Sequence, residues 1–272
     1  MASQNSWLNG SNDPKKAREI VEFLEARSKY PDQIIVNSTL KDVLNPQKGE
    51  RLLEVGSGSG VLSRLMVNNL SPGGLIIGID KSPEIVKLSR HYALEHNLNN
   101  SIDFKVDDAR NLDYPDRFFD GAFAARLLLY ISNPLEVINE LVRVVKPGGR
   151  IVLMDWDFET LVLDHSNREL TRRIFHWRND NKDGNNWSGR QLYRLLKFGG
   201  LKEVTIYPVV TIALDDKSSL TQTLWHAASN TLEQGIITTE EYESWVSEVR
   251  LRIKMQQYFA SIVYFIAHGI VP

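Results

Sequence analysis

Cysteine is absent from all 272 residues of the sequence, and its absence removes several kinds of chemistry. Disulfide bonds, thiolate metal sites and a cysteine nucleophile are excluded. An excess of charge of either sign is also lacking, because 32 basic residues stand against 34 acidic ones. A net charge of −2 provides no overall positive field that would attract a nucleic acid. We therefore expect no nucleic-acid partner.

Long apolar runs are missing as well. The longest candidate, residues 259–271 (FASIVYFIAHGIV), is interrupted by His268 and Gly269. It falls short of the roughly 20 apolar residues that a membrane helix needs. Residues 1–16 lack the apolar centre of a signal peptide. We expect a cytoplasmic protein with no membrane span.

The composition that is present is ordinary for a globular protein, with 42% hydrophobic and 24% charged residues. Short apolar runs alternate with segments of helical spacing. The predicted strands are 51–55, 75–80, 102–109, 118–125 and 150–157, and the predicted helices between them are 61–70, 82–97 and 133–145. This alternation predicts an α/β fold with a mostly parallel sheet covered by helices.

The two ends of the chain depart from this alternation. Helices are predicted at 14–30 and about 34–44, and again at 188–200, 219–235 and 239–260, with further strands at 201–213 and 261–271. Two helices thus separate the last two strands. We expect an N-terminal helical lid segment over 1–45 and a core over 46–213. A helical lid insertion over 214–257 and a final core strand over 258–272 complete the predicted organisation.

The stretch LEVGSGSG at residues 53–60 places glycines 56, 58 and 60 between a strand and a helix. Glycine inside an element costs about 0.5–1 kcal/mol relative to alanine, so three of them need a reason. A tight turn that brings free N–H groups of the helix start against an anion supplies one. The spacing differs from the dinucleotide fingerprint because Val61 stands where that motif has glycine or alanine, and no P-loop lysine follows.

The second predicted strand ends in Asp80, a carboxylate placed to accept hydrogen bonds from the two hydroxyls of a ribose. The carboxyl ends of parallel strands share one rim of the sheet, so Asp80 and the glycine loop belong to one site. The alternative is that Asp80 caps the helix that begins at Ser82-Pro83.

Several motifs in matching order resemble those of class I S-adenosylmethionine (SAM) methyltransferases. The stretch EVGSGSG at 54–60 resembles the motif E/D-x-G-x-G-x-G, and Asp80 resembles the acid that ends the second strand. The remaining motifs are Asp108-Ala109, Phe119-Asp120 and VVKPGG at 144–149. The resemblance covers residues 50–157 closely, in the style of the ubiquinone and menaquinone C-methyltransferases. It continues more loosely to the end of the chain, as in a subgroup of small-molecule methyltransferases.

The resemblance implies a Rossmann-like, seven-stranded, mostly parallel sheet with helices on both faces, and SAM as cofactor. In the family, the acid matching Glu54 holds the methionine amino group, backbone of the glycine loop meets its carboxylate, and the acid matching Asp108 takes the adenine amine. The cofactor-binding residues implied are Glu54, Gly56, Ser57, Gly58, Gly60, Asp80, Lys81, Asp108, Ala109 and Arg126.

The activity implied is methyl transfer from SAM to a small, mostly nonpolar metabolite, such as a natural product or a quinone, by in-line displacement. S-adenosylhomocysteine (SAH) would be the other product. The partner is then a small-molecule acceptor, and a homodimer is left open. Two alternatives remain: a non-catalytic SAM-binding module and an oxidoreductase with a nucleotide cofactor.

No general base is identified by the sequence. Where the subgroup commonly has R-V-L-x-H after the fourth strand, residues 126–130 read RLLLY, so the role of that histidine does not transfer. The weak catalytic candidates are Asp155, Asp157, His165, His176 and Tyr130, with Trp156 as an apolar wall. Each has a purely structural alternative. A metal site built from Asp155, Asp157 and His165 has no recognised spacing, so we expect no metal.

Overall fold

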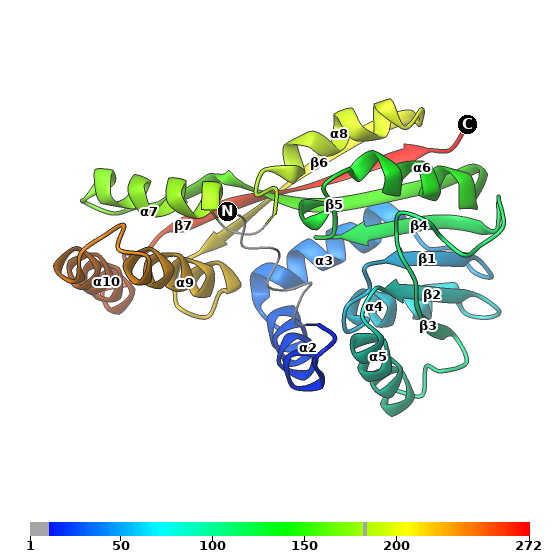
Figure 1. Cartoon of the computed structure of the whole chain (residues 1–272), viewed down its shortest axis with the longest axis horizontal. Coiled ribbons are helices and arrows are strands. Elements are labelled where there is room, and N and C mark those ends of the chain that lie inside the picture. The colour runs from blue at the N-terminus through cyan, green and yellow to red at the C-terminus, as the bar shows by residue number, and fades with distance from the viewer. Residues whose placement is uncertain (1–10, 182–183) are drawn as a thin grey trace.

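The computed structural model describes residues 11–181 and 184–272, and its centre is one seven-stranded sheet in the order β3-β2-β1-β4-β5-β7-β6 (Figure 1). The strands are β1 (Arg51–Val55), β2 (Leu75–Asp80), β3 (Ile102–Val106), β4 (Phe119–Ala125), β5 (Val145–Leu163), β6 (Lys202–Ala213) and β7 (Ala260–Ile270). Strands β1 to β5 pair in parallel, and β7 runs antiparallel to both of its neighbours. The predicted fold class is confirmed.

Helices cover both faces of this sheet, as expected. They are α2 (Pro14–Ser28), α3 (Pro31–Leu44), α4 (Val61–Leu70), α5 (Pro83–Glu95), α6 (Pro134–Val144), α7 (Arg168–Asn181), α8 (Ser188–Phe198), α9 (Ser219–Glu233) and α10 (Thr239–Lys254), with a 3-10 turn η1 (Leu128–Tyr130). Buried residues of α3, α4 and α5 share one core cluster with α7, α9 and α10, and those of α6 and α8 form a second cluster on the opposite face. Apolar burial on two faces explains why the parallel strands read as nearly continuous apolar runs.

Strand order reverses direction between β1 and β4, because β2 and β3 lie to one side of β1 and β4 and β5 to the other. In open parallel sheets, ligands bind outside the carboxyl ends of the strands at such a point. The glycine loop after β1 and residues 126–130 after β4 therefore flank the expected binding crevice.

Several predicted boundaries are wrong, each for a local reason. β5 runs from Val145 to Leu163, longer than the predicted 150–157, because Val145 pairs with Phe119 of β4 and residues 162–163 pair with β7, each across an irregularity in register. β3 ends at Val106, and residues 107–109, the rest of the segment predicted as this strand and its exit, form the turn that follows it. The last helix ends at Lys254 and not at residue 260, and its cap is Thr238 rather than Thr239, with a capping box to Glu241.

Helix α7 was not predicted at all. Its buried residues Leu170, Ile174 and Phe175 have helical spacing, but they sit among arginines, and the segment reads as polar in sequence. α7 packs on the end of β5 and on α9. In Figure 1, α7, α9 and α10 gather around the part of β5, β6 and β7 that extends past the shorter strands.

The two helices between β6 and β7 are where the sequence predicts an insertion. Trp245 and Leu224 of these helices are 0% and 1% exposed and belong to the main core cluster. The division into lid and core segments stays a prediction, and the first ten residues of segment 1–45 lie outside the described residues. Within the described residues, no helix has the length and apolarity to cross a membrane.

Candidate active site

The glycine loop between β1 and α4 needs its glycines for both conformation and space. Gly56, Gly58 and Gly60 all have positive φ, at 69°, 52° and 76°. A Cβ on Gly60 would lie 2.2 Å from Cζ of Phe104, a fully buried ring on β3. A Cβ on Gly58 would lie 2.8 Å from Cδ1 of Leu24 on α2. The loop thus packs closely against Phe104 of β3 on one side and against Leu24 of α2 on another.

Two buried hydroxyls of the glycine loop have no hydrogen-bond partner. Ser57 and Ser59 are 6% and 1% exposed, and the Oγ atom of each is unpartnered. An unpartnered buried polar atom carries a desolvation cost, which a ligand that supplies a partner removes. Ser57 is one of the predicted cofactor residues, whereas Ser59 was missed, because the motif marks only the glycines around it.

Glu54, the last-but-one residue of β1, is 2% exposed and turns toward α4. Its Oε2 accepts hydrogen bonds from both the backbone N–H, at 3.1 Å, and the hydroxyl of Ser63. Burial raises the pKa of Glu54 to about 7, against these bonds that favour the charged form. The arrangement fixes the first turn of α4 and keeps an acid directly under the glycine loop.

Asp80, at the end of β2, ties the glycine loop to the next turn of the chain. Its Oδ2 accepts from Gly58 N–H at 3.1 Å and its Oδ1 accepts from Ser82 N–H at 3.0 Å. Burial raises the pKa of Asp80 despite these bonds. The side chain that caps α5 is that of Ser82, which accepts from Ile85 N–H. The helix cap is therefore supplied without Asp80, which is held at the rim instead.

The acids after β3 lie in its exit turn rather than on the strand. Asp108 pairs with Arg110, at 2.7 Å, and more distantly with Lys81, at 3.8 Å. Hydrogen bonds from Arg110 lower the pKa of Asp108 to about 2. Asp107 accepts from the backbone N–H of Asp108 and of Asp113, so it shapes the turn. Ala109 follows in the same turn, partly buried against the second core cluster. These positions form the outer end of the rim.

On the other side of β1, residues after β4 form a different environment. Arg126 has a φ of 56°, and its backbone N–H donates to Met154 of β5. Its Nη1 donates to Gln33 of α3 at 3.5 Å, while its Nε is buried without a partner. Burial lowers the pKa of Arg126 and raises that of Tyr130, which follows in η1. Both therefore lie in a poorly hydrated part of the rim.

Asp155 is the most strongly perturbed of the catalytic candidates. It is 1% exposed, its Oδ2 accepts from Leu129 N–H at 3.2 Å, and its Oδ1 has no partner. Burial raises the pKa of Asp155 to about 7, while the neighbouring Ser188 hydroxyl and, less strongly, the charge of Arg126 oppose this shift. Trp156, the next residue, faces the other side of β5 and packs against Phe158 and Tyr264. A carboxyl group that titrates near neutral pH, here beside the residues that follow β4, is suited to proton transfer.

Asp157 and His176 are engaged elsewhere. Asp157 is held by both Nε and Nη2 of Arg190, the latter at 2.8 Å, so it anchors α8 to β5. Asp157 also accepts a hydrogen bond from the backbone N–H of Glu159. His176 is exposed on α7. Neither arrangement resembles a base directed at a bound molecule.

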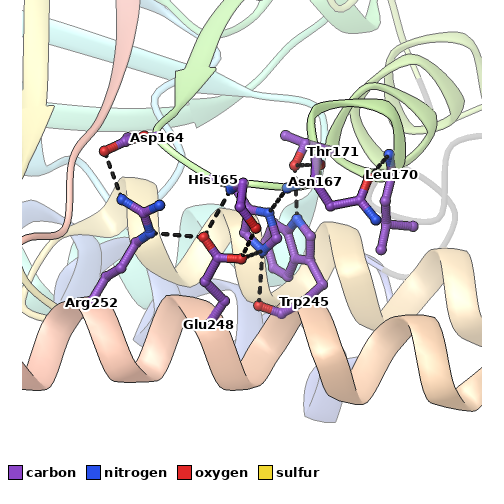
Figure 2. Close-up of polar contacts among 9 residues, drawn as sticks. Asp164, His165, Asn167, Leu170, Thr171, Trp245, Glu248 and Arg252 are labelled. Atoms are coloured by element: carbon purple, nitrogen blue, oxygen red, sulfur yellow. Dashed lines mark hydrogen bonds and ion pairs between the residues drawn. The ribbon is translucent and has the colours of Figure 1, made fainter.

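His165 lies in the connection between β5 and α7, where it contacts α10 (Figure 2). Its Nδ1 accepts from Asn167 N–H at 3.0 Å, so the ring proton is on Nε2, which donates to the carbonyl of Trp245 at 3.3 Å. The ring stacks on Trp245, and Glu248 lies 3.5 Å from Nε2. Arg252 forms ion pairs with both Glu248 and Asp164. These contacts give His165 a structural role that fastens α10 to the end of β5.

Two polar side chains at this rim, one arginine and one glutamine, were not identified from the sequence. Arg178 of α7 is 4% exposed and lies 3.3 Å above the ring centroid of Phe158. Gln33 of α3 donates to Tyr264 Oη at 3.0 Å and accepts from Arg126. Neither belongs to a motif, and only the helical spacing of Ile174 and Arg178 hinted that this arginine faces inward. The structure describes no group of three or more metal-binding side chains in residues 11–181 and 184–272.

A family model described as a methyltransferase domain matches residues 46–245. Because the match covers more than half of the chain, the protein belongs to this methyltransferase family. Together with its relatives and structural neighbours, this places it among the class I SAM-dependent methyltransferases. The cofactor of this class is SAM, as the sequence motifs predicted.

Among curated proteins, the chain is similar to an uncharacterized 37.1 kDa protein in transposon TN4556 of Streptomyces fradiae, with 30% identity over 67% of this chain and 52% of the relative. It is also 29% identical to the ubiquinone/menaquinone biosynthesis C-methyltransferase UbiE of Pseudomonas savastanoi pv. phaseolicola, over 41% of this chain and 44% of the relative. The chain thus spans about half the length of these curated relatives.

Solved structures share the fold at low sequence identity. The phosphoethanolamine N-methyltransferase 2 of Haemonchus contortus, in complex with SAM, matches with a TM-score of 0.63 and 14% identity, over 100% of this chain and 60% of that one. The [4+2]-cyclase SpnF matches with a TM-score of 0.56 and 22% identity, over 87% and 80% of the two chains. At these identities the likeness concerns the fold alone.

Proposed function

We propose that the protein transfers a methyl group from SAM to a small organic molecule bound at the carboxyl ends of β4 and β5. One observation carries this proposal above the others. The glycine loop, Glu54 and Asp80 form one connected, buried rim in which two serine hydroxyls have no partner. Such a rim is incomplete without a polar ligand.

The residues present fit the cofactor. Bound SAM supplies an electrophilic methyl group on a sulfonium. The loop around Gly58, with the hydroxyls of Ser57 and Ser59, would hold the amino-acid end, and Glu54 would favour its ammonium group. Asp80 would accept from the ribose hydroxyls, and the turn at Asp108-Ala109 would meet the adenine. Lys81 and Arg126 would lie at the two edges of this site.

The chain contributes alignment and exclusion of water more than covalent chemistry. Holding an acceptor in line with a reactive carbon is worth up to roughly 7–11 kcal/mol in favourable cases. Where the acceptor must lose a proton, Asp155 is the best-suited group, since it combines an unpartnered oxygen with a pKa of about 7. A base of this kind contributes roughly 10²–10⁴-fold.

Turnover tests the proposal directly. The full chain is incubated with SAM and a panel of small-molecule acceptors, and SAH release is measured. Binding of SAH and of NADH is titrated by calorimetry on the same preparation. We expect SAH to bind, NADH not to bind, and at least one acceptor to give SAH release. SAH binding without release for every acceptor would favour the non-catalytic alternative, and NADH binding alone would favour an oxidoreductase.

The likeness to a cyclase of the same fold shows why turnover is the decisive readout. That protein is described as a [4+2]-cyclase, although its fold matches this chain as well as several methyltransferases do. A fold hosts many reactions, and only the site decides among them. Methyl transfer by this chain is accordingly proposed from its rim and its family, not from its fold.

A further inference from the structure

Three arginines from distant parts of the chain lie near Tyr130, and the positive charge of each opposes the rise in the pKa of this tyrosine. One of them is buried and two are partly buried. Arg27 comes from α2, Arg126 from the end of β4 and Arg178 from α7. Other arginines of the protein pair with carboxylates, as Arg64 does with Glu25 and Arg173 with Glu241. Within the described residues, none of the three forms an ion pair. Buried cations are normally paired, so this cluster calls for a reason.

A continuous set of contacts joins Arg178 to Arg126. The Arg178 guanidinium lies on the Phe158 ring, and the ring centroids of Phe158 and Trp156 are 4.8 Å apart. The centroids of Trp156 and Tyr264 are 6.1 Å apart. Tyr264 and Arg126 then meet through the two ends of the Gln33 amide. The rings of Phe158, Trp156 and Tyr264, which we call the aromatic floor, therefore lie between the guanidinium groups of Arg178 and Arg126.

The unpartnered polar atoms along this floor are hydrogen-bond donors. They are Nε of Arg126, Nη1 of Arg178 and Nε1 of Trp156. Arg178 is 4% exposed, so its free donor is shielded from bulk water. Three unsatisfied donors on two cations and an indole match a group that only accepts hydrogen bonds and carries negative charge.

The acids near the cluster do not neutralise it. Asp32 accepts from both the backbone N–H and the hydroxyl of Ser219, and its one negative charge offsets only part of the charge of three arginines. Asp155 and Glu54 have pKa values raised by burial to about 7, so each is only partly charged at neutral pH. Burial also lowers the pKa of Arg27 and of Arg178 to about 9, and for Arg27 repulsion by Arg126 adds to this shift. The cluster therefore has an excess of positive charge in a dry environment.

The position of the cluster relates it to the acceptor rather than to the cofactor. Leu24 of α2 packs on Gly58, and Arg27 follows one turn later on the same helix. Arg126 directly follows β4, across the strand-order reversal from Asp80. The acids expected to hold the nucleoside thus lie on the β2 and β3 side, and the arginines on the β4 and β5 side.

Building on the proposed function, we propose that the arginine cluster of Arg27, Arg126 and Arg178 binds an oxyanion group of the methyl acceptor. The acceptor class is then a small molecule with a carboxylate or phosphate group and an apolar or aromatic body that lies on Trp156, Phe158 and Tyr264. The anion balances both the cluster and the sulfonium charge of the cofactor. This changes the expectation of a mostly nonpolar acceptor to one with a charged end.

Calorimetry with matched probe pairs tests this proposal. The full chain, with and without saturating SAH, is titrated with benzoate, with phenyl phosphate and with neutral benzamide. We expect at least one anion to bind 10-fold or more tightly than benzamide, and the better of the two identifies the oxyanion. Arg178→Gln should weaken binding of that anion by 10-fold or more, while SAH binding stays within twofold. Arg173→Gln, an exposed position on the same helix, should change neither.

A second readout separates a binding role from a structural one. Removing an unpaired buried charge relieves a cost of the ligand-free fold. Arg178→Met should therefore leave the melting temperature unchanged or raise it by about 2–4 °C, the shift for one kcal/mol in a domain of this size. A fall of more than that, or anions that bind no better than benzamide, overturns the proposal. Failure of the wild-type protein to bind SAH would instead overturn the proposed function. The anion titration without SAH would still test the arginine cluster in that case.

Discussion

The two halves of the rim differ in how their charges are satisfied. On the side of β1, β2 and β3, each acid is bound by the chain itself: Glu54 by Ser63, Asp80 by Gly58 and Ser82, and Asp108 by Arg110. On the side of β4, β5 and β7, arginines and Asp155 carry atoms without partners. In the first half the acids are held by the chain and the unpartnered atoms are the neutral hydroxyls of Ser57 and Ser59, whereas in the second half charged side chains carry unpartnered atoms.

The difference follows from what each half has to recognise. A cofactor common to a whole family is gripped by a fixed frame, whose geometry is built into tight turns and short hydrogen bonds. An acceptor that varies between relatives is recognised by side chains from added elements. Here these are α2, α3 and α7, which lie outside the repeating strand–helix units.

The largest effect is expected from a methyl group added to the fixed half. Gly60→Ala forces a Cβ to 2.2 Å from the buried Phe104 ring, at a φ of 76°. Overpacking and left-handed strain together should lower the free energy of unfolding by about 2–5 kcal/mol. Urea unfolding measures this loss.

Gly49→Ala is the matched control for that substitution. Gly49 has nearly the same φ, 78°, but a Cβ there would have nothing within 4 Å. It should lose only the backbone part, about 1–2 kcal/mol. Equal losses at the two positions would show that Phe104 does not constrain the loop.

A smaller effect is expected from replacing Asp80, which binds the glycine loop and is proposed to accept from the ribose hydroxyls of the cofactor. Asp80→Ala should weaken SAH binding by about 1.5–3 kcal/mol, roughly 10- to 150-fold, the range for hydrogen bonds to a charged group. Calorimetry measures the dissociation constant, and circular dichroism confirms the fold. The exposed Asp42→Ala should bind as the wild type does. An unchanged constant in Asp80→Ala would remove this residue from the site.

A further effect, small at any one pH step, concerns pH and the open half. The pKa of Asp155 is about 7 in the folded protein and 3.8 for an ordinary aspartate. The folded state therefore holds an extra proton between these values, and this group makes wild-type stability fall as pH rises through that window, by up to about 1.4 kcal/mol per pH unit. Asp155→Asn lacks this fall, so its stability relative to wild type should increase from pH 4 to pH 8. Urea unfolding across that range checks the sign, and a constant difference would contradict it.

The sequence predicted the fixed half well, because its chemistry is local. The turn after β1 requires glycine at 56, 58 and 60, and the acid that follows β2 is placed by the end of one strand. Strand and helix alternation then determined the sheet. These features depend on neighbours in the chain, and a motif records them.

The open half was missed because it depends on contacts between distant segments. Arg178 lies on a helix whose arginine-rich sequence hides its apolar face, and Gln33 is an unremarked residue of α3. The sequence identified Asp155 and Asp157 as equals, yet only the structure shows that Arg190 occupies Asp157 while Asp155 keeps a free oxygen. Pairing of this kind is decided by tertiary packing.

A crystal structure of the full chain grown with SAH tests the central claim most directly. The account predicts that the nucleoside lies over the ends of β1, β2 and β3, with ribose hydroxyls donating to Asp80 and the amino-acid end against Ser57 and Ser59. The arginine cluster should remain outside the contacts of the adenosine. Density for SAH in any other part of the protein, with the glycine loop unchanged and vacant, would contradict it.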